Sequence, residues 1–224
     1  CINLKTISIP DSVNIIPAGC FNGCIELTKV ELPSTITKIS NDAFSNCCNL
    51  IDILISDVVT EIGSSAFHNC SNLCKIQIPD SVIEIGPSAF EGCRSLESIN
   101  LSQKIKYINC NTFRGCELLN KIWIPKNVAI IGSEAFGGCE NMSIVAIQSN
   151  HIKIDPTAFL QCSNISRLYL ANNNPNVVIS SFGDSIAIKI ISPISDYDRI
   201  KSSASTSAED LYKTHATNLK YMAL

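Results

Sequence analysis

The sequence predicts a solenoid, in which equal turns of chain stack and pair their strands into a parallel β-sheet. Three observations predict this fold: a cysteine recurs every 23 residues, two alternating apolar positions follow it, and a phenylalanine stands near the end of each period. The cysteine column comprises Cys1, Cys24, Cys47, Cys70, Cys93, Cys116, Cys139 and Cys162. A fixed period of about 20–29 residues is typical of proteins in which each repeat forms one turn of a coil.

The first element of each turn is a short strand with one buried face. Two apolar positions flank a variable one, as expected when side chains alternate between the two faces of a strand. The first apolar column comprises Ile7, Val30, Ile53, Ile76, Ile99, Ile122, Val145 and Leu168. The second comprises Ile9, Leu32, Ile55, Ile78, Leu101, Ile124, Ile147 and Leu170. We expect equivalent residues of successive turns to pair in parallel.

Two further columns complete the core of each turn. One comprises Ile16, Ile39, Ile62, Ile85, Ile108, Ile131, Ile154 and Val177, and the other comprises Phe21, Phe44, Phe67, Phe90, Phe113, Phe136, Phe159 and Phe182. Burying the large apolar side chains of one repeat yields roughly 8–15 kcal/mol. Ordering the repeat costs on the order of 1.5 kcal/mol for each of its 23 residues, which exceeds this gain, so a single repeat cannot fold alone. In the seventh turn, a shift by one residue is predicted to place Ile152 in the core instead of His151.

The repeat consensus resembles the BspA-like class of leucine-rich repeats over residues 1 to about 191. The fourth repeat carries the resemblance best, as Cys70-Ser-Asn-Leu73-Cys-Lys-Ile76-Gln-Ile78-Pro79-Asp-Ser81-Val82-Ile-Glu-Ile85-Gly86-Pro-Ser-Ala89-Phe90. The resemblance implies a right-handed leucine-rich-repeat coil with a parallel β-sheet on its concave face, and with turns and short helical turns elsewhere. It also implies adhesion, because proteins of this class occur on bacterial surfaces and in some parasitic protists.

The chain divides by pattern into a solenoid over residues 1–191 and a C-terminal cap or helical tail over 192–224. The solenoid comprises eight 23-residue units, which start at residues 1, 24, 47, 70, 93, 116, 139 and 162, and a terminal strand within 186–191. A helix is expected from about residue 208, because a capping box precedes apolar residues on one helical face. The absence of a similar cap before Cys1 suggests that further repeats precede it.

The composition excludes several classes of partner. The net charge is −3, with 17% charged residues and no basic run, which argues against a nucleic-acid partner. No stretch approaches the ~18 apolar residues that a membrane-spanning helix needs, so no membrane insertion is expected within these residues.

No catalytic, cofactor or metal site is predicted, although the chain contains 12 cysteines. Ladder cysteines would lie about 4.8 Å apart along one axis and point the same way, whereas zinc needs converging ligands and a disulfide needs facing ones. We expect buried free thiols in the ladder, and Cys48 or Cys74 as the residues for an occasional disulfide. Glu61 and Glu84 share a column, which predicts either a weak cation site or, more simply, a solvated edge.

The histidines give no support to a catalytic triad. The three residues are His68, His151 and His215, and they lie at unrelated positions of the repeat. The register places no serine or cysteine partner beside any of them, so an enzyme is not expected.

The outward positions of the strands predict a partner-binding surface, because the fold does not dictate them. A cluster near the C-terminal end combines aromatic, apolar and cationic side chains, at Lys121, Trp123, Ile144, Ala146, Arg167 and Tyr169. Exposed aromatic residues beside cations are typical of interface hot spots. The alternative is that Trp123 only covers its neighbours or packs against the cap.

The function predicted from these observations is non-enzymatic recognition of a protein or glycan, on a cell surface or after secretion. A host extracellular-matrix or surface protein would be one such partner. The alternative is an intracellular, cytoplasmic protein-protein interaction scaffold, which the many unpaired thiols of a reducing compartment would fit.

Overall fold

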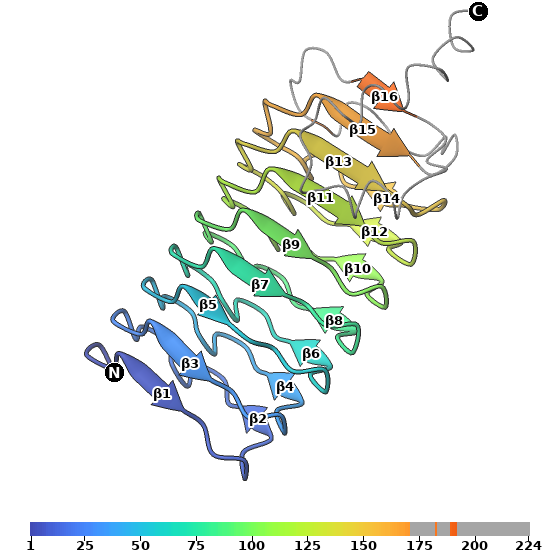
Figure 1. The fold of residues 1–224 in the computed structure, drawn as a ribbon. Helices are drawn as coiled ribbons and strands as arrows, with labels where there is room; N and C mark the ends of the chain where they lie inside the picture. The colour runs from blue at the N-terminus through green and yellow to red at the C-terminus, as the bar shows by residue number, and fades with distance from the viewer. Residues whose placement is uncertain (171–181, 183–188, 192–224) are drawn as a thin grey trace, which may run out of the picture. The chain divides into compact units, whose positions relative to one another are not determined.

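The computed structural model describes residues 1–170, Phe182 and 189–191, and these form a solenoid with two rows of strands (Figure 1). The first row comprises β1 (Thr6–Ser8), β3 (Lys29–Glu31), β5 (Asp52–Ile53), β7 (Lys75–Gln77), β9 (Ser98–Asn100), β11 (Lys121–Ile124), β13 (Ile144–Ile147), β15 (Arg167–Leu170) and β16 (Lys189–Ile191). The second comprises the two-residue strands β2 (Ile15–Ile16), β4 (Lys38–Ile39), β6 (Glu61–Ile62), β8 (Glu84–Ile85), β10 (Tyr107–Ile108), β12 (Ile130–Ile131) and β14 (Lys153–Ile154).

The strands pair in parallel with the register that the sequence period predicts. Ile7 pairs with Val30 between β1 and β3, and Ile122 pairs with Val145 between β11 and β13, each across one 23-residue period. The first row is hydrogen-bonded as sheets of two, three and four strands, and the second as sheets of four and three. The second row of strands is a finding of the structure, since the sequence predicted its isoleucine column but not its pairing.

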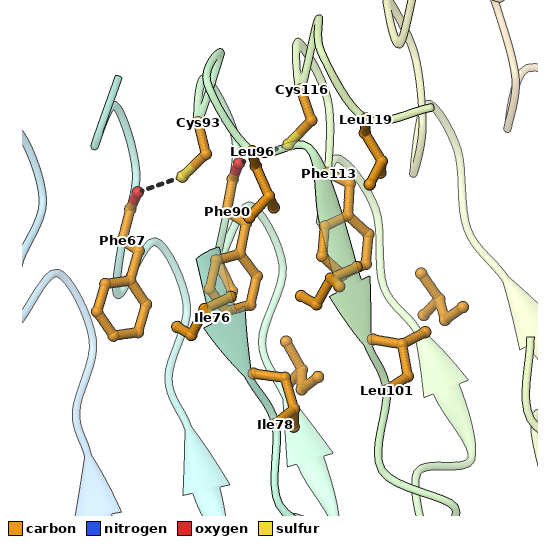
Figure 2. Packing of buried hydrophobic residues seen from close by; sticks show 14 of the residues in the cluster. Phe67, Ile76, Ile78, Phe90, Cys93, Leu96, Leu101, Phe113, Cys116 and Leu119 are labelled. Atoms are coloured by element: carbon orange, nitrogen blue, oxygen red, sulfur yellow. Dashed lines mark hydrogen bonds between the residues drawn. The ribbon is translucent and has the colours of Figure 1, made fainter. Parts of the chain in front are cut away.

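The predicted apolar columns form one continuous core. The phenylalanines stack along the solenoid with ring centroids 4.7 to 5.5 Å apart and nearly parallel planes, from Phe21 to Phe182. Figure 2 shows Phe67, Phe90 and Phe113 in this stack beside the isoleucines and leucines of the strands. The predicted shift in the seventh turn is confirmed, because Ile152 is fully buried and His151 is exposed.

No α-helix forms between the strands in the part of the chain that the structure describes, so the short helical turns expected there are not supported. Around Phe44, alternate backbone N–H groups bond to the next turn of the solenoid instead of to their own. The N–H of Phe44 donates to the carbonyl of Ala66 in that next turn, at 2.8 Å. Ser45 instead bonds back to Asp42 within its own turn, at 3.1 Å. Positive φ angles at Asp42 and Asn46, of 55° and 59°, reverse the chain on either side of Phe44. A continuing helix bonds successive N–H groups back within the segment, whereas here alternate ones bond to the next turn, so no helix forms around Phe44.

The chain divides into two compact units, Cys1–Pro193 and Ile194–Leu224. Strand β16 lies where the sequence predicts a last strand and pairs in parallel with β15. The cap or helical tail expected over 192–224 lies outside the described residues. Within the described residues, no helix has the length and apolarity that crossing a bilayer requires.

Candidate binding surface

The candidate surface is the outward face of the first row of strands. Side chains alternate along a strand, so the positions on either side of each buried isoleucine point away from the core. Over β1 to β9 these positions are all exposed, at Thr6, Ser8, Lys29, Glu31, Asp52, Leu54, Lys75, Gln77, Ser98 and Asn100. The solenoid core does not use these side chains, which leaves them available to a partner.

A groove of about 570 Å³ lies on this face over β3, β5 and β7. Leu54 follows β5 at an outward position, and 79% of its side chain is exposed. The equivalent residues on the neighbouring turns are Glu31 and Gln77, which also line the groove. An isolated apolar side chain therefore stands between polar ones on an open strand face.

Charged residues surround Leu54. The Lys29 ammonium lies 2.7 Å from the Glu31 carboxylate, and both side chains are exposed. Their hydrogen bond raises the pKa of Lys29 and lowers that of Glu31, and the charge of Asp52 adds to the rise at Lys29. Asp52 pairs in backbone register with Lys75, yet the described residues contain no ion pair within 4 Å that involves either of them.

The structure brings the six residues of the predicted partner-binding cluster together. Register neighbours on β11, β13 and β15 are Lys121, Ile144 and Arg167 in one row, and Trp123, Ala146 and Tyr169 in the other. The Lys121 ammonium lies 5.5 Å from the centroid of the Trp123 ring, within the range of a cation–π interaction.

The expectation that this cluster is exposed is wrong. Only 9% of Trp123, 1% of Ala146 and 3% of Tyr169 is exposed, and the other three residues are half-buried. Among the residues that the structure describes, the buried Trp123 Nε1–H has no hydrogen-bond acceptor. Strand alternation determines which side of a sheet a residue faces, but not whether that side is open to water. Binding of a partner by these six residues therefore stays a prediction.

Leu54 is a candidate site residue that the sequence analysis does not predict. It stood in the same outward column as Trp123, but the aromatic cluster had the stronger resemblance to a hot spot. The available signal was that Leu54 is a large apolar residue at an outward position whose neighbours along the column, Glu31 and Gln77, are polar.

The ladder cysteines serve the fold. From Cys24 to Cys139 they are buried free thiols, as predicted, and Cys162 is buried too, whereas Cys1 in the first turn is exposed. The Cys93 thiol donates to the carbonyl of Phe67 at 3.2 Å, and Cys116 repeats this bond with Phe90 at 3.3 Å (Figure 2). Burial raises the pKa of the Cys47 thiol to about 12, which disfavours the reactive thiolate.

The other chemical candidates lie apart from one another. Cys48 and Cys74 are free and half-buried, so no disulfide joins them in this structure. Glu61 stacks on Glu84 but forms an ion pair with Lys38 at 2.7 Å, which supports the solvated edge. The described residues contain no group of three or more side chains that could hold a metal ion. His215 lies outside these residues.

Comparison with known protein families finds one family whose matches cover most of the chain. A family model described as BspA type leucine rich repeat region, present in six copies, matches residues 1–106 and 83–211. No curated protein matches the chain.

Solved structures with the same fold come from bacteria. A leucine-rich repeat protein from Bacteroides ovatus has 22% identity and a TM-score of 0.60, with 85% of this chain and 62% of that chain covered. A leucine rich repeat protein from T. pallidum has 32% identity and a TM-score of 0.59, with 63% and 66% covered. A leucine rich cell surface protein from Faecalibacterium prausnitzii has 25% identity and a TM-score of 0.55, with 83% and 63% covered. The chain thus spans less than two thirds of the Bacteroides ovatus protein's length.

Proposed function

Since the chain belongs to the BspA-type leucine-rich repeat family, we propose that it is a non-enzymatic recognition module that binds a protein or glycan through its strand face. Membership of this family suggests a protein-interaction or adhesion module, and the solenoid fold is typically non-enzymatic. Function in such folds resides in surface side chains, which stacking of the repeats does not constrain.

The open strand face over β1 to β9 is the observation that carries this proposal. Its outward side chains are exposed, it includes a groove of about 570 Å³, and Leu54 stands in that groove almost fully exposed to water. Burial of a leucine side chain contributes about 1.5–3 kcal/mol, so a partner that covers Leu54 gains affinity from one contact.

We further propose display at a cell surface or secretion. The Faecalibacterium prausnitzii protein, whose fold this chain shares at 25% identity, is described as a cell surface protein, which supports this location. The alternative is an intracellular scaffold, which the free thiols favour. Surface labelling of intact cells that express the protein separates the two, because an impermeant reagent reaches only an exported chain.

The predicted partner-binding cluster on β11, β13 and β15 remains part of the proposal. Contact of a partner with Trp123 and Tyr169 requires that these side chains become accessible, because they are buried in this structure. A Trp123→Ala, Tyr169→Ala double variant with a verified fold tests this role. We expect weaker binding if the cluster contributes to recognition, and unchanged binding if it only packs.

The experiment that tests the function is binding of this chain to immobilised extracellular-matrix and serum proteins. We expect a specific interaction that Leu54→Asp weakens by about tenfold or more, since a charge at the contact replaces an apolar side chain. Ile83→Asp is the matched control, because Ile83 is 58% exposed but lies beside β8 in the second row of strands. Equal losses in both variants would place binding away from the strand face, and no binding by wild type would favour the scaffold alternative.

A further inference from the structure

Four charged residues line the groove over β3, β5 and β7, and one pair of them forms an ion pair whereas the other pair does not. Lys29 and Glu31 satisfy each other in an ion pair at 2.7 Å. Asp52 and Lys75 are also exposed and opposite in charge, and they occupy register-paired positions on β5 and β7. In the described residues neither forms an ion pair within 4 Å, although the charge of Asp52 also acts on Lys29, so the Asp52 carboxylate and the Lys75 ammonium are open to a ligand.

Strand geometry gives the spacing of Asp52, Leu54 and Lys75 on this face. Side chains two residues apart on a strand lie about 6.7 Å apart on the same face, which is the separation of Asp52 from Leu54 along the chain. Register-paired residues on adjacent strands lie about 4.8 Å apart, which is the separation expected between Asp52 and Lys75. The groove therefore presents an anion, a cation and an apolar side chain within a few ångströms of one another.

From this charge arrangement we infer that the groove is a docking site for an extended protein segment that sets an apolar side chain on Leu54, a basic one beside Asp52 and an acidic one beside Lys75. The inference rests on the proposed function and names the chemistry of the partner. An extended segment aligned with β5 repeats every two residues at the same ~6.7 Å spacing, so a basic and an apolar residue separated by one position match Asp52 and Leu54.

A protein segment fits this surface better than a glycan does. Leu54 offers no hydrogen-bond donor or acceptor, so a sugar hydroxyl placed on it would lose its water without compensation. An apolar side chain gains from the same contact. The two unpaired charges add specificity, because a partner with the opposite arrangement would place like charges together.

The test uses a display library of random peptides, selected for binding to the intact chain. Enriched peptides are then measured against the double variant D52K/K75D, which exchanges the two charges and leaves the net charge at −3. The matched control is K38E/E61K, because Lys38 and Glu61 are also a register-paired couple of opposite charge but belong to β4 and β6 in the second row. Circular dichroism and thermal unfolding establish that each variant is folded.

We expect the enriched peptides to combine basic, acidic and apolar residues, to bind D52K/K75D at least about tenfold more weakly, and to bind K38E/E61K like wild type. Equal affinity for wild type and D52K/K75D overturns the docking site, as does a selection that enriches no peptide. The proposed function fails separately, when the wild-type chain binds nothing in the matrix and serum panel. A panel partner that D52K/K75D retains at full affinity leaves recognition intact and refutes only this site.

Discussion

Raising the pH from 8 to 10 ionises cysteine thiols in the unfolded chain while the buried ladder keeps them protonated. The pKa of Cys47 rises from 9.0 to about 12 because burial penalises the thiolate. Burial raises the pKa of Cys70, Cys93, Cys116 and Cys139 in the same direction. Since the unfolded chain then binds fewer protons than the native one, this contribution to stability is fully present below pH 9 and is lost as the pH rises from 9 through the native pKa values.

The magnitude follows from the difference between the two states. At pH 10, ionisation of a thiol whose pKa is 9.0 in the unfolded chain and about 12 in the native one favours unfolding by about 1 kcal/mol. The pKa values of Cys70, Cys93, Cys116 and Cys139 are raised in the same direction, so these thiols add to the loss of stability at alkaline pH. We therefore expect the chain to be less stable at pH 10 than at pH 8.

Urea unfolding followed by circular dichroism at pH 8 and pH 10 measures this effect. The Cys47→Ala variant should lose about 1 kcal/mol less than wild type between the two pH values, because one titrating thiol is gone. Cys20→Ala, at an exposed position, is the matched control. If Cys47→Ala and wild type lose the same free energy of unfolding, ionisation of the ladder does not explain alkaline unfolding and the reasoning fails.

Three further substitutions test the core and turns by urea unfolding at pH 7. Phe113→Ala should cost about 3–5 kcal/mol, because this fully buried ring stacks on both neighbours, and a loss below about 1 kcal/mol would contradict a continuous stack. Ile152→Ala should cost about 2–5 kcal/mol and His151→Ala less than about 0.5 kcal/mol, whereas the reverse order would refute the register shift. Gly86→Ala should destabilise by more than about 1 kcal/mol, because a Cβ would lie 2.4 Å from the Ser64 backbone nitrogen, and a neutral effect would mean that this approach relaxes freely.

The sequence was sufficient for the core and for the pairing of the first row of strands. Equivalent residues repeat at one interval without insertions, so only one register buries every column at once. The burial of Ile152 in place of His151 followed from the same argument, because an imidazole in the core column would lose its water.

The tertiary structure alone decided the local conformation around the phenylalanines. The same residues could form a helical turn or a reversal, and the choice depends on whether their N–H groups bond within the segment or to the next turn. Phe44 bonds to Ala66, so neighbouring turns select the reversal. The cysteine column likewise predicted only that these side chains are buried. The hydrogen bond from the Cys93 thiol to the Phe67 carbonyl depends on how successive turns pack, so only the structure shows it.

The sequence by itself determined which side of the sheet each outward residue faces, since alternation along a strand is a local property. Only the tertiary structure decided which of those residues meet water. Trp123 and Leu54 occupy the same column, yet the first is buried and the second exposed. Exposure depends on every atom near a side chain in space, including those far away in the chain, and no repeat pattern encodes it.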